Sequence, residues 1–142
     1  MILKKANIED LNKLLEIENA CFAQKDSPLN KRTMGYHLRR KRIIGAYDRE
    51  ELLGYILIFP RKIPRIYSIA IHPQARGKGT AKKLIKEALH VNKNLRLEVR
   101  DDNQNAINLY EKLGFTCKGI KKAFYPDGCD ARVYYLNQSK FL

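Results

Sequence analysis

The sequence predicts a mixed α/β fold in which helices cover both faces of one sheet. Two kinds of segment support this prediction: short apolar runs that alternate as strands do, and longer segments with apolar residues at helical spacing. Their predicted order is β-α-α-β-β-β-α-β-α-β-β. Adjacent hairpin strands, followed by strand–helix crossovers, require antiparallel and parallel pairing within the same sheet.

The N-terminal segment is expected to form a short strand followed by a helix. Residues 2–5 are the strand. Asn7 and Asp10 have the spacing of a capping box, so the helix begins immediately after Asn7. Apolar residues then recur at helical spacing until about residue 22, which predicts one helix with a single buried face.

A second helix and a hairpin follow. Asn30 is a favourable N-cap residue, and the helix that it opens is expected near residues 31–40. Two apolar runs, 43–47 and 52–59, flank the polar turn 48–51. Apolar runs on both sides of a short polar turn are typical of a β-hairpin.

The second half of the chain alternates strands with helices. A strand at 66–71 leads through a glycine-containing turn into a helix, and a strand at 95–99 leads into another helix, which ends at Gly114. Two closing strands are expected at about 115–123 and 130–136, because the proline and glycine between them favour a turn.

Length and composition fit one globular domain over residues 1–142. Of the 142 residues, 44% are hydrophobic and 30% charged, which excludes disordered, collagen-like and low-complexity chains. No apolar run reaches the roughly 18 residues of a spanning helix. Acidic residues follow the N-terminus too closely for a secretory signal. We therefore expect a cytoplasmic protein without membrane association.

Cysteine and histidine spacing predicts neither disulfides nor a metal site. Cys21, Cys117 and Cys129 are odd in number and far apart, and the histidines have no ligand partners at metal-site spacing. No serine or cysteine lies in the sequence context of a nucleophile elbow, so a covalent acyl-enzyme is not expected.

The chain is strongly basic. Its 28 Lys and Arg residues and 15 Asp and Glu residues give a formal net charge of +13. Such a surplus favours polyanionic partners, including RNA, a ribosomal surface or a phosphorylated cofactor. It is equally compatible with a purely solubilising role, so contact with RNA remains open.

The segment most indicative of chemistry is the turn that follows the strand at 66–71. Gly77 and Gly79 let a backbone approach an anion without an intervening Cβ, and the helix that follows presents unpaired N–H groups. Nearby cations, among them Arg76, Lys78 and Lys82, suit a phosphate. The glycines alone would also fit an ordinary strand-to-helix turn, and the segment matches neither the P-loop nor the Rossmann pattern.

The same segment resembles the acetyl-CoA signature of the GNAT N-acetyltransferase superfamily. The family pattern R/Q-x-x-G-x-G/A corresponds here to Arg76, Gly79 and Ala81, preceded by an apolar strand and His72-Pro73. Ala81 stands where glycine is commoner. The resemblance implies the GNAT fold, acetyl-CoA as co-substrate and acyltransferase activity.

The similarity extends over roughly residues 50–136. It continues through the segment from Leu97 to Phe115 and ends in Tyr125-Pro126-Asp127-Gly128. This longer pattern resembles the RimI-like branch of ribosomal-protein alanine and N-terminal acetyltransferases. Before residue 45, only the order of elements agrees with the family.

The resemblance implies roles for individual residues. Glu98 corresponds to the general base, Tyr110 to the general acid, and Tyr125 to a tyrosine near the substrate amine. The cofactor-binding residues that it implies are Ile69, Ala70 and Ile71 for the pantetheine arm, then Arg76, Gly77, Lys78, Gly79, Thr80, Ala81, Lys82 and Asn103. Each has a structural alternative: Asn103 as a helix N-cap, Tyr110 as a core residue, and Glu98 as a solvent-facing strand residue.

Simple pKa arithmetic favours an α-amine acceptor over a lysine. An α-amine with a pKa of about 7.7–8.0 needs roughly 1 kcal/mol to reach its neutral form at pH 7, whereas a lysine amine needs about 4.6 kcal/mol. A phenol of pKa about 10 donates fully to a thiolate of pKa about 8.5 only at a cost of about 2 kcal/mol. A hydrogen bond from Tyr110 to the leaving thiolate is therefore the less demanding role.

The sequence leaves three functions open. The favoured one is acetylation of a protein N-terminus, with a ribosomal protein as the implied acceptor. The alternatives are acetylation of a small-molecule amine and a non-catalytic, CoA-holding module that binds the ribosome or RNA. Basic residues of the second helix and of the last hairpin are expected to flank the acceptor, which favours neutral or acidic acceptor segments. These are Lys31, Arg32, Arg39, Arg40, Lys41 and Arg42, then Lys118, Lys121 and Lys122.

Overall fold

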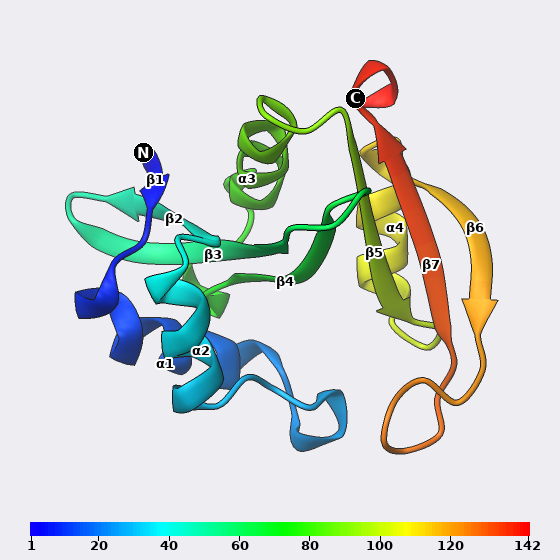
Figure 1. Cartoon of the computed structure of the whole chain (residues 1–142), viewed down its shortest axis with the longest axis horizontal. Helices are drawn as coiled ribbons and strands as arrows, with labels where there is room; N and C mark the ends of the chain where they lie inside the picture. The colour runs from blue at the N-terminus through cyan, green and yellow to red at the C-terminus, as the bar shows by residue number, and fades with distance from the viewer.

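The computed structural model describes all 142 residues and consists of one seven-stranded sheet with four α-helices (Figure 1). The strands are β1 (Ile2–Lys5), β2 (Ile43–Asp48), β3 (Glu51–Phe59), β4 (Arg65–Ile71), β5 (Asn94–Arg100), β6 (Thr116–Lys121) and β7 (Ala131–Asn137). The helices are α1 (Leu11–Cys21), α2 (Lys31–Arg39), α3 (Thr80–Leu89) and α4 (Gln104–Lys112). The predicted order of elements is confirmed, as is the mixed sheet.

The sheet divides between β4 and β5. Strand order is β1-β2-β3-β4-β5-β7-β6, and every neighbouring pair is antiparallel except β4 and β5. Those two strands are parallel and pair only where Arg65 lies opposite Arg96. Beyond this point they diverge, as Figure 1 shows, because no further backbone pairing holds them together. The divergence leaves backbone groups of both strands free.

Each face of the sheet carries its own hydrophobic core. On one face, α3 and α4 contribute Leu84, Ile85 and Ile107 to a cluster with strand residues such as Leu97. On the other face, α1 and α2 contribute a second cluster, which includes Leu14. Strands covered on both faces must be apolar throughout, which explains the unbroken apolar runs of β2 and β3. None of the helices combines the length and apolar character needed to span a membrane.

The predicted caps hold the helices at the expected places. Asn7 and Asp10 form the capping box, but the first turn (Ile8–Asp10) is a 3-10 helix, so α1 begins only at Leu11. The Asn30 side chain accepts from the backbone N–H of Thr33 at 2.9 Å and caps α2. Gly114 follows α4 with a φ of +106°, and a Cβ there would collide with the Lys140 carbonyl. Only glycine fits this position.

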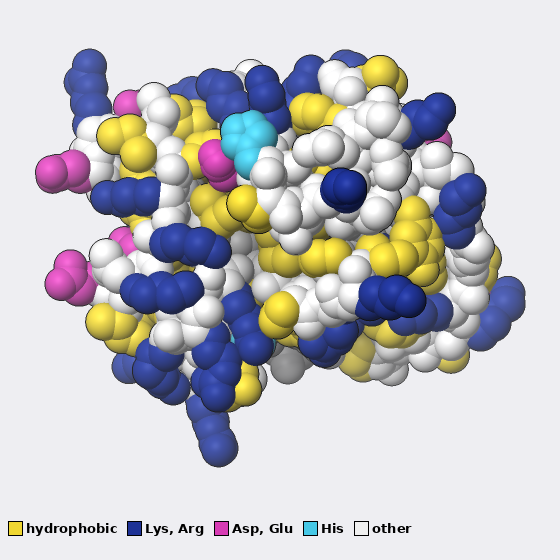
Figure 2. Space-filling model, turned by 45° about the horizontal axis from the view of Figure 1, so that its top comes forward, with side chains coloured by type: hydrophobic (Ala, Val, Ile, Leu, Met, Phe, Trp, Pro, Cys, Tyr) yellow, Lys and Arg dark blue, Asp and Glu magenta, His cyan; other side chains and the backbone are white.

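Lys and Arg side chains are distributed widely over the surface. Figure 2 shows them across one face of the molecule, with few acidic side chains between them. The surplus charge of +13 is therefore not confined to one helix.

A buried carboxylate joins α1 to the sheet. The side chain of Glu18, which is 3% exposed, accepts from the Leu29 N–H at 2.9 Å, from Ser68 Oγ at 3.0 Å and from the Tyr55 hydroxyl. We expect Glu18→Leu to lower the free energy of unfolding by about 3 kcal/mol, because it leaves buried donors without their acceptor. Urea denaturation measures the loss. Glu18→Gln, which retains one acceptor oxygen, should lose less, and equal losses for both variants would contradict this account.

Candidate active site

A cleft of about 770 Å³ opens where β4 and β5 diverge, and it extends to the N-terminus of α3 and to α4. It brings together residues that lie far apart in the sequence. The predicted site residues that line it are Ile69, Ala70, Ile71, Arg76, Gly77, Gly79, Thr80, Ala81, Lys82, Glu98, Asn103, Tyr110 and Tyr125. Lys78 is exposed and is the one predicted residue outside the lining.

The turn before α3 is shaped for an anion. Gly77 and Gly79 have φ angles of +83° and +71°, and a Cβ added at either would meet no atom within 4 Å. The Thr80 hydroxyl is buried but has no hydrogen-bond partner. Open space beside two glycines, an unpaired hydroxyl and the free N–H groups of a helix N-terminus fit a phosphate group.

The strand β4 offers an extended edge along the cleft. Ile69, Ala70 and Ile71 pair with β3 on one side only, so their remaining backbone groups face the opening toward β5. A linear ligand with amide groups can add to such an edge as another strand would. Arg76 is turned back toward β4, since its Nε donates to the Ile71 carbonyl at 3.2 Å. Asn103 caps α4 by accepting from the Ala106 N–H at 3.2 Å, and it also faces the cleft.

Glu98 lies on β5 at the centre of the cleft. Its side chain is only 2% exposed, so the alternative of a solvent-facing strand residue is wrong. Oε2 lies 2.7 Å from Arg96 Nη1 and 3.4 Å from Lys121 Nζ. Oε1 lies 2.5 Å from Arg65 Nε as an ion pair. Both carboxylate oxygens of Glu98 are therefore in contact with cations.

Tyr110 projects from α4 into the same cleft. It is 9% exposed, and its ring packs edge-on against Phe115 with centroids 5.4 Å apart, so it belongs to the core as well as to the cleft. Burial raises the pKa of its hydroxyl above the ordinary value, and the neighbouring Tyr125 adds to the shift. The phenol is therefore protonated at neutral pH and can act as a hydrogen-bond donor.

Tyr125 comes from the loop between β6 and β7 and faces Glu98 across the cleft. Burial is the main cause that raises its pKa to about 12, and the negative charge of Glu98 contributes. The Arg100 guanidinium lies 4.9 Å from the centre of the Tyr125 ring. This cation–π contact fixes the ring at the end of the cleft.

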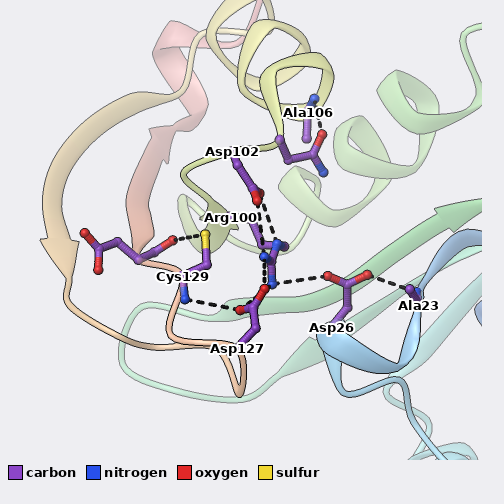
Figure 3. Close-up of polar contacts among 9 residues, drawn as sticks. Ala23, Asp26, Arg100, Asp102, Ala106, Asp127 and Cys129 are labelled. Atoms are coloured by element: carbon purple, nitrogen blue, oxygen red, sulfur yellow. Dashed lines mark hydrogen bonds and ion pairs between the residues drawn. The ribbon is translucent and has the colours of Figure 1, made fainter.

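Arg100 is the principal residue of this site that sequence reasoning missed. Figure 3 shows its guanidinium between three aspartates from different segments of the chain. It contacts Asp127 at 2.6 Å, Asp102 at 3.0 Å and Asp26 at 3.6 Å. Asp26 belongs to the α1–α2 connection, whereas Asp127 belongs to the β6–β7 loop, so Arg100 holds both loops at the mouth of the cleft. The sequence signals were its place in the segment from Leu97 to Phe115 that resembles the family and its position two residues after Glu98, on the same face of β5.

The Arg100 contacts predict a pH-dependent stability. Hydrogen bonds from Arg100 hold the pKa values of Asp127 and Asp102 below their ordinary range. The stabilisation is therefore present above the unfolded-state pKa of about 3.9 and is lost as the pH falls through the lower folded-state values. We expect the free energy of unfolding of Arg100→Leu to fall less steeply than that of the native protein as the pH is lowered from about 5 to 3. Urea midpoints measured across this range for both proteins test this, and identical pH dependence would contradict it.

Comparison with known sequences finds relatives that are named as N-terminal and as peptidyl-lysine N-acetyltransferases. Residues 11–115 match the profile of the Acetyltransferase (GNAT) family. A Bacillus subtilis protein named as a ribosomal protein bS18-alanine N-acetyltransferase is 31% identical, over 94% of this chain and 93% of that protein. A Mycobacterium leprae protein of uncharacterised function is 35% identical in an alignment of 96 residues that covers 62% of this chain but only 27% of that protein.

Solved structures show the same fold. The ribosomal-protein-S18-alanine N-acetyltransferase from Escherichia coli superposes with a TM-score of 0.83 over 96% of this chain and 92% of that chain. The two sequences are 24% identical. At this identity, the likeness concerns the arrangement of the elements and not the substrate.

Proposed function

The chain belongs to the acetyltransferase (GNAT) family, and from this premise we propose that it transfers the acetyl group of acetyl-CoA to the α-amine of a protein N-terminus. The observation that carries the proposal is one cleft that combines an anion-binding turn, a free strand edge, a carboxylate and a protonated phenol. The Bacillus subtilis relative, named for acetylating an alanine of ribosomal protein bS18, supports the choice of an N-terminal acceptor.

The residues present fit acetyl-CoA. Gly77, Gly79 and Thr80 would hold the pyrophosphate, and the free edge of β4 at Ile69–Ile71 would hold the pantetheine arm. The bound co-substrate supplies an activated acetyl group as a thioester. No residue of this chain is required to carry the acetyl group covalently.

Glu98 on β5 and Tyr110 on α4 have separate roles in the proposed transfer. The amine nitrogen forms a bond to the acetyl carbon as the carbon–sulfur bond breaks. Glu98 accepts the proton that the amine loses, directly or through a water. Tyr110 donates a hydrogen bond to the departing sulfur, which takes its proton from solvent afterwards. Because burial makes Tyr110 a weaker acid, stabilising the thiolate by hydrogen bonding suits it better than complete proton transfer.

A thiol-release assay separates the candidate functions. The protein is incubated with acetyl-CoA and either N-terminal peptides or small free amines, and the liberated CoA thiol is titrated. Turnover with peptides above that with free amines is the expected result. Turnover with small amines alone would support the small-molecule function. CoA binding by calorimetry without any turnover would support the non-catalytic module.

We predict that Glu98→Gln lowers kcat by about 100-fold and changes the pH dependence of kcat/KM, because the amide cannot accept the amine proton. Steady-state rates between pH 6 and pH 9 measure both effects. An unaltered pH profile with a normal rate would remove Glu98 as the base. Acetyl-CoA affinity serves as the control, since Glu98 lies away from the phosphate-binding turn.

A further inference from the structure

The surroundings of Glu98 carry more positive charge than one carboxylate can balance. Arg65, Arg96 and Lys121 all contact this single side chain, at 2.5, 2.7 and 3.4 Å. One carboxylate among three cations leaves a local surplus of two positive charges. The two carboxylates of the β6–β7 loop are already paired, that of Asp127 with Arg100 at 2.6 Å and that of Asp130 with Lys122 at 3.3 Å.

Two of these cations are partly buried. The side chains of Arg65 and Arg96 are only 21% and 22% exposed. Arg65 is also held over the ring of Tyr67, 5.2 Å from its centre. Partly buried charges are weakly screened and gain more from a fixed anion than exposed ones. The surplus charge therefore marks a place where an anion would be stabilised.

A groove of about 670 Å³ continues from this point across β5, β7 and β6. Pairing places Glu98 beside Val133 and Arg96 beside Tyr135, so these four side chains share one face of the sheet. The groove, called the basic groove below, is lined by Arg96, Lys118, Lys121, Val133 and Tyr135. Two of these lining residues, Arg96 and Lys121, are also among the cations that contact Glu98.

The position of the basic groove relative to Glu98 sets which acceptor residues reach it. Glu98 and Arg96 are two residues apart on the same face of β5, about 7 Å along the strand. An extended acceptor advances about 3.3 Å per residue. With its α-amine at Glu98 and its backbone running toward Arg96, the acceptor would place its third residue beside Arg96. The Lys121 backbone is level with Arg100, but its Nζ lies 3.4 Å from Glu98 and would therefore lie nearer the second residue.

We propose that the basic groove selects acceptors with a carboxylate side chain at the second or third residue. Arg96 and Lys121 bind the carboxylate, Arg65 adds to the positive field, and Val133 and Tyr135 form the apolar floor under the acceptor backbone. This inference rests on the proposed N-terminal acetylation. It identifies the residues of this chain that bind the acceptor side chain, and the acceptor positions at which they select a carboxylate.

Three otherwise identical peptides that begin with alanine test the inference, with Glu, Gln or Lys at residues two and three. The measured quantity is kcat/KM at low and at moderate salt. We expect the Glu peptide to exceed the Gln peptide by about tenfold and the Lys peptide by more, with the differences shrinking as salt rises. Turnover of the Gln peptide tests the proposed function separately from the selectivity.

A charge reversal away from Glu98 tests the groove itself. Lys118→Glu alters the groove without removing a contact to the catalytic carboxylate, and we expect it to reduce the Glu-over-Gln ratio at least threefold. Lys93→Glu is the matched control, because it changes the net charge equally from an exposed loop outside both the groove and the cleft. The ratio should stay unchanged there.

Three results would overturn the inference. One is an equal kcat/KM for the Glu and Gln peptides when the protein acetylates both. Another is an equal change of the ratio in Lys118→Glu and Lys93→Glu, which would indicate a general charge effect. The third is inhibition of all three peptides alike by single-stranded polyuridylate, together with no Glu preference, which would assign the basic groove to RNA.

Discussion

Replacing Gly79 with valine is expected to weaken acetyl-CoA binding by about 100-fold or more. Gly79 has a φ of +71°, and the space beside its Cα is open to at least 4 Å. In the proposed complex this space holds the pyrophosphate, so the branched side chain would occupy the place of the ligand. It would also disfavour the backbone conformation that directs the N–H groups of α3 toward the phosphates.

Isothermal titration with CoA measures this effect, and a matched variant separates its two causes. Gly128, in the β6–β7 loop, has a φ of +87° and equally open space, so Gly128→Val introduces similar backbone strain away from the phosphate-binding turn. We expect it to lower stability but to bind CoA nearly normally. Comparable loss of CoA affinity in both variants would mean that strain, and not occupation of the anion site, explains the result.

The part of the site that the sequence predicted is local in the chain. The turn that we propose to bind phosphate lies within one strand–turn–helix segment, so its geometry follows from the positions of Gly77 and Gly79 and from the helix that they precede. The caps at Asn7 and Asn30 were predictable for the same reason, since a cap and its partners are at most three residues apart. Local patterns are readable because the contacts that enforce them are close in sequence.

The environment of Glu98 was not predictable in this way. Alternation along β5 assigns Glu98 to the face opposite Leu97, but it does not show what covers that face. Two of the three cations that contact Glu98 come from β4 and β6. Arg65 reaches Glu98 only because β4 and β5 pair at the single position Arg65–Arg96. The sequence therefore left Glu98 as either a base or a surface residue, and tertiary structure decided that it is buried.

The Arg100 cluster shows the same limit more strongly. Asp26 and Asp127 are about a hundred residues apart in the chain, and each looks like an ordinary turn residue. Only the folded arrangement brings both to one guanidinium. The role of Glu18 was hidden in the same way, since its partners Tyr55 and Ser68 lie 37 and 50 residues away in the chain.

The remaining large effect is expected from Tyr110→Phe, which should lower kcat by about 100-fold while leaving stability and CoA affinity near their normal values. The ring still fills the core beside Phe115, and the hydroxyl has no hydrogen-bond partner in the protein, so its removal leaves no buried group unpaired. What is lost is the donor that would stabilise the departing sulfur, a contribution of the size usual for such groups.

Tyr134→Phe is the matched control for this prediction. Tyr134 is a buried tyrosine of the same core, but its hydroxyl donates to Glu111 at 2.7 Å and does not line the cleft. Its loss should reduce the free energy of unfolding by about 1 kcal/mol and leave kcat unchanged. Single-turnover rates at saturating acetyl-CoA distinguish the two variants. If both lower kcat alike, the tyrosines act through core packing; if only Tyr110→Phe does so, the hydroxyl itself takes part in the transfer.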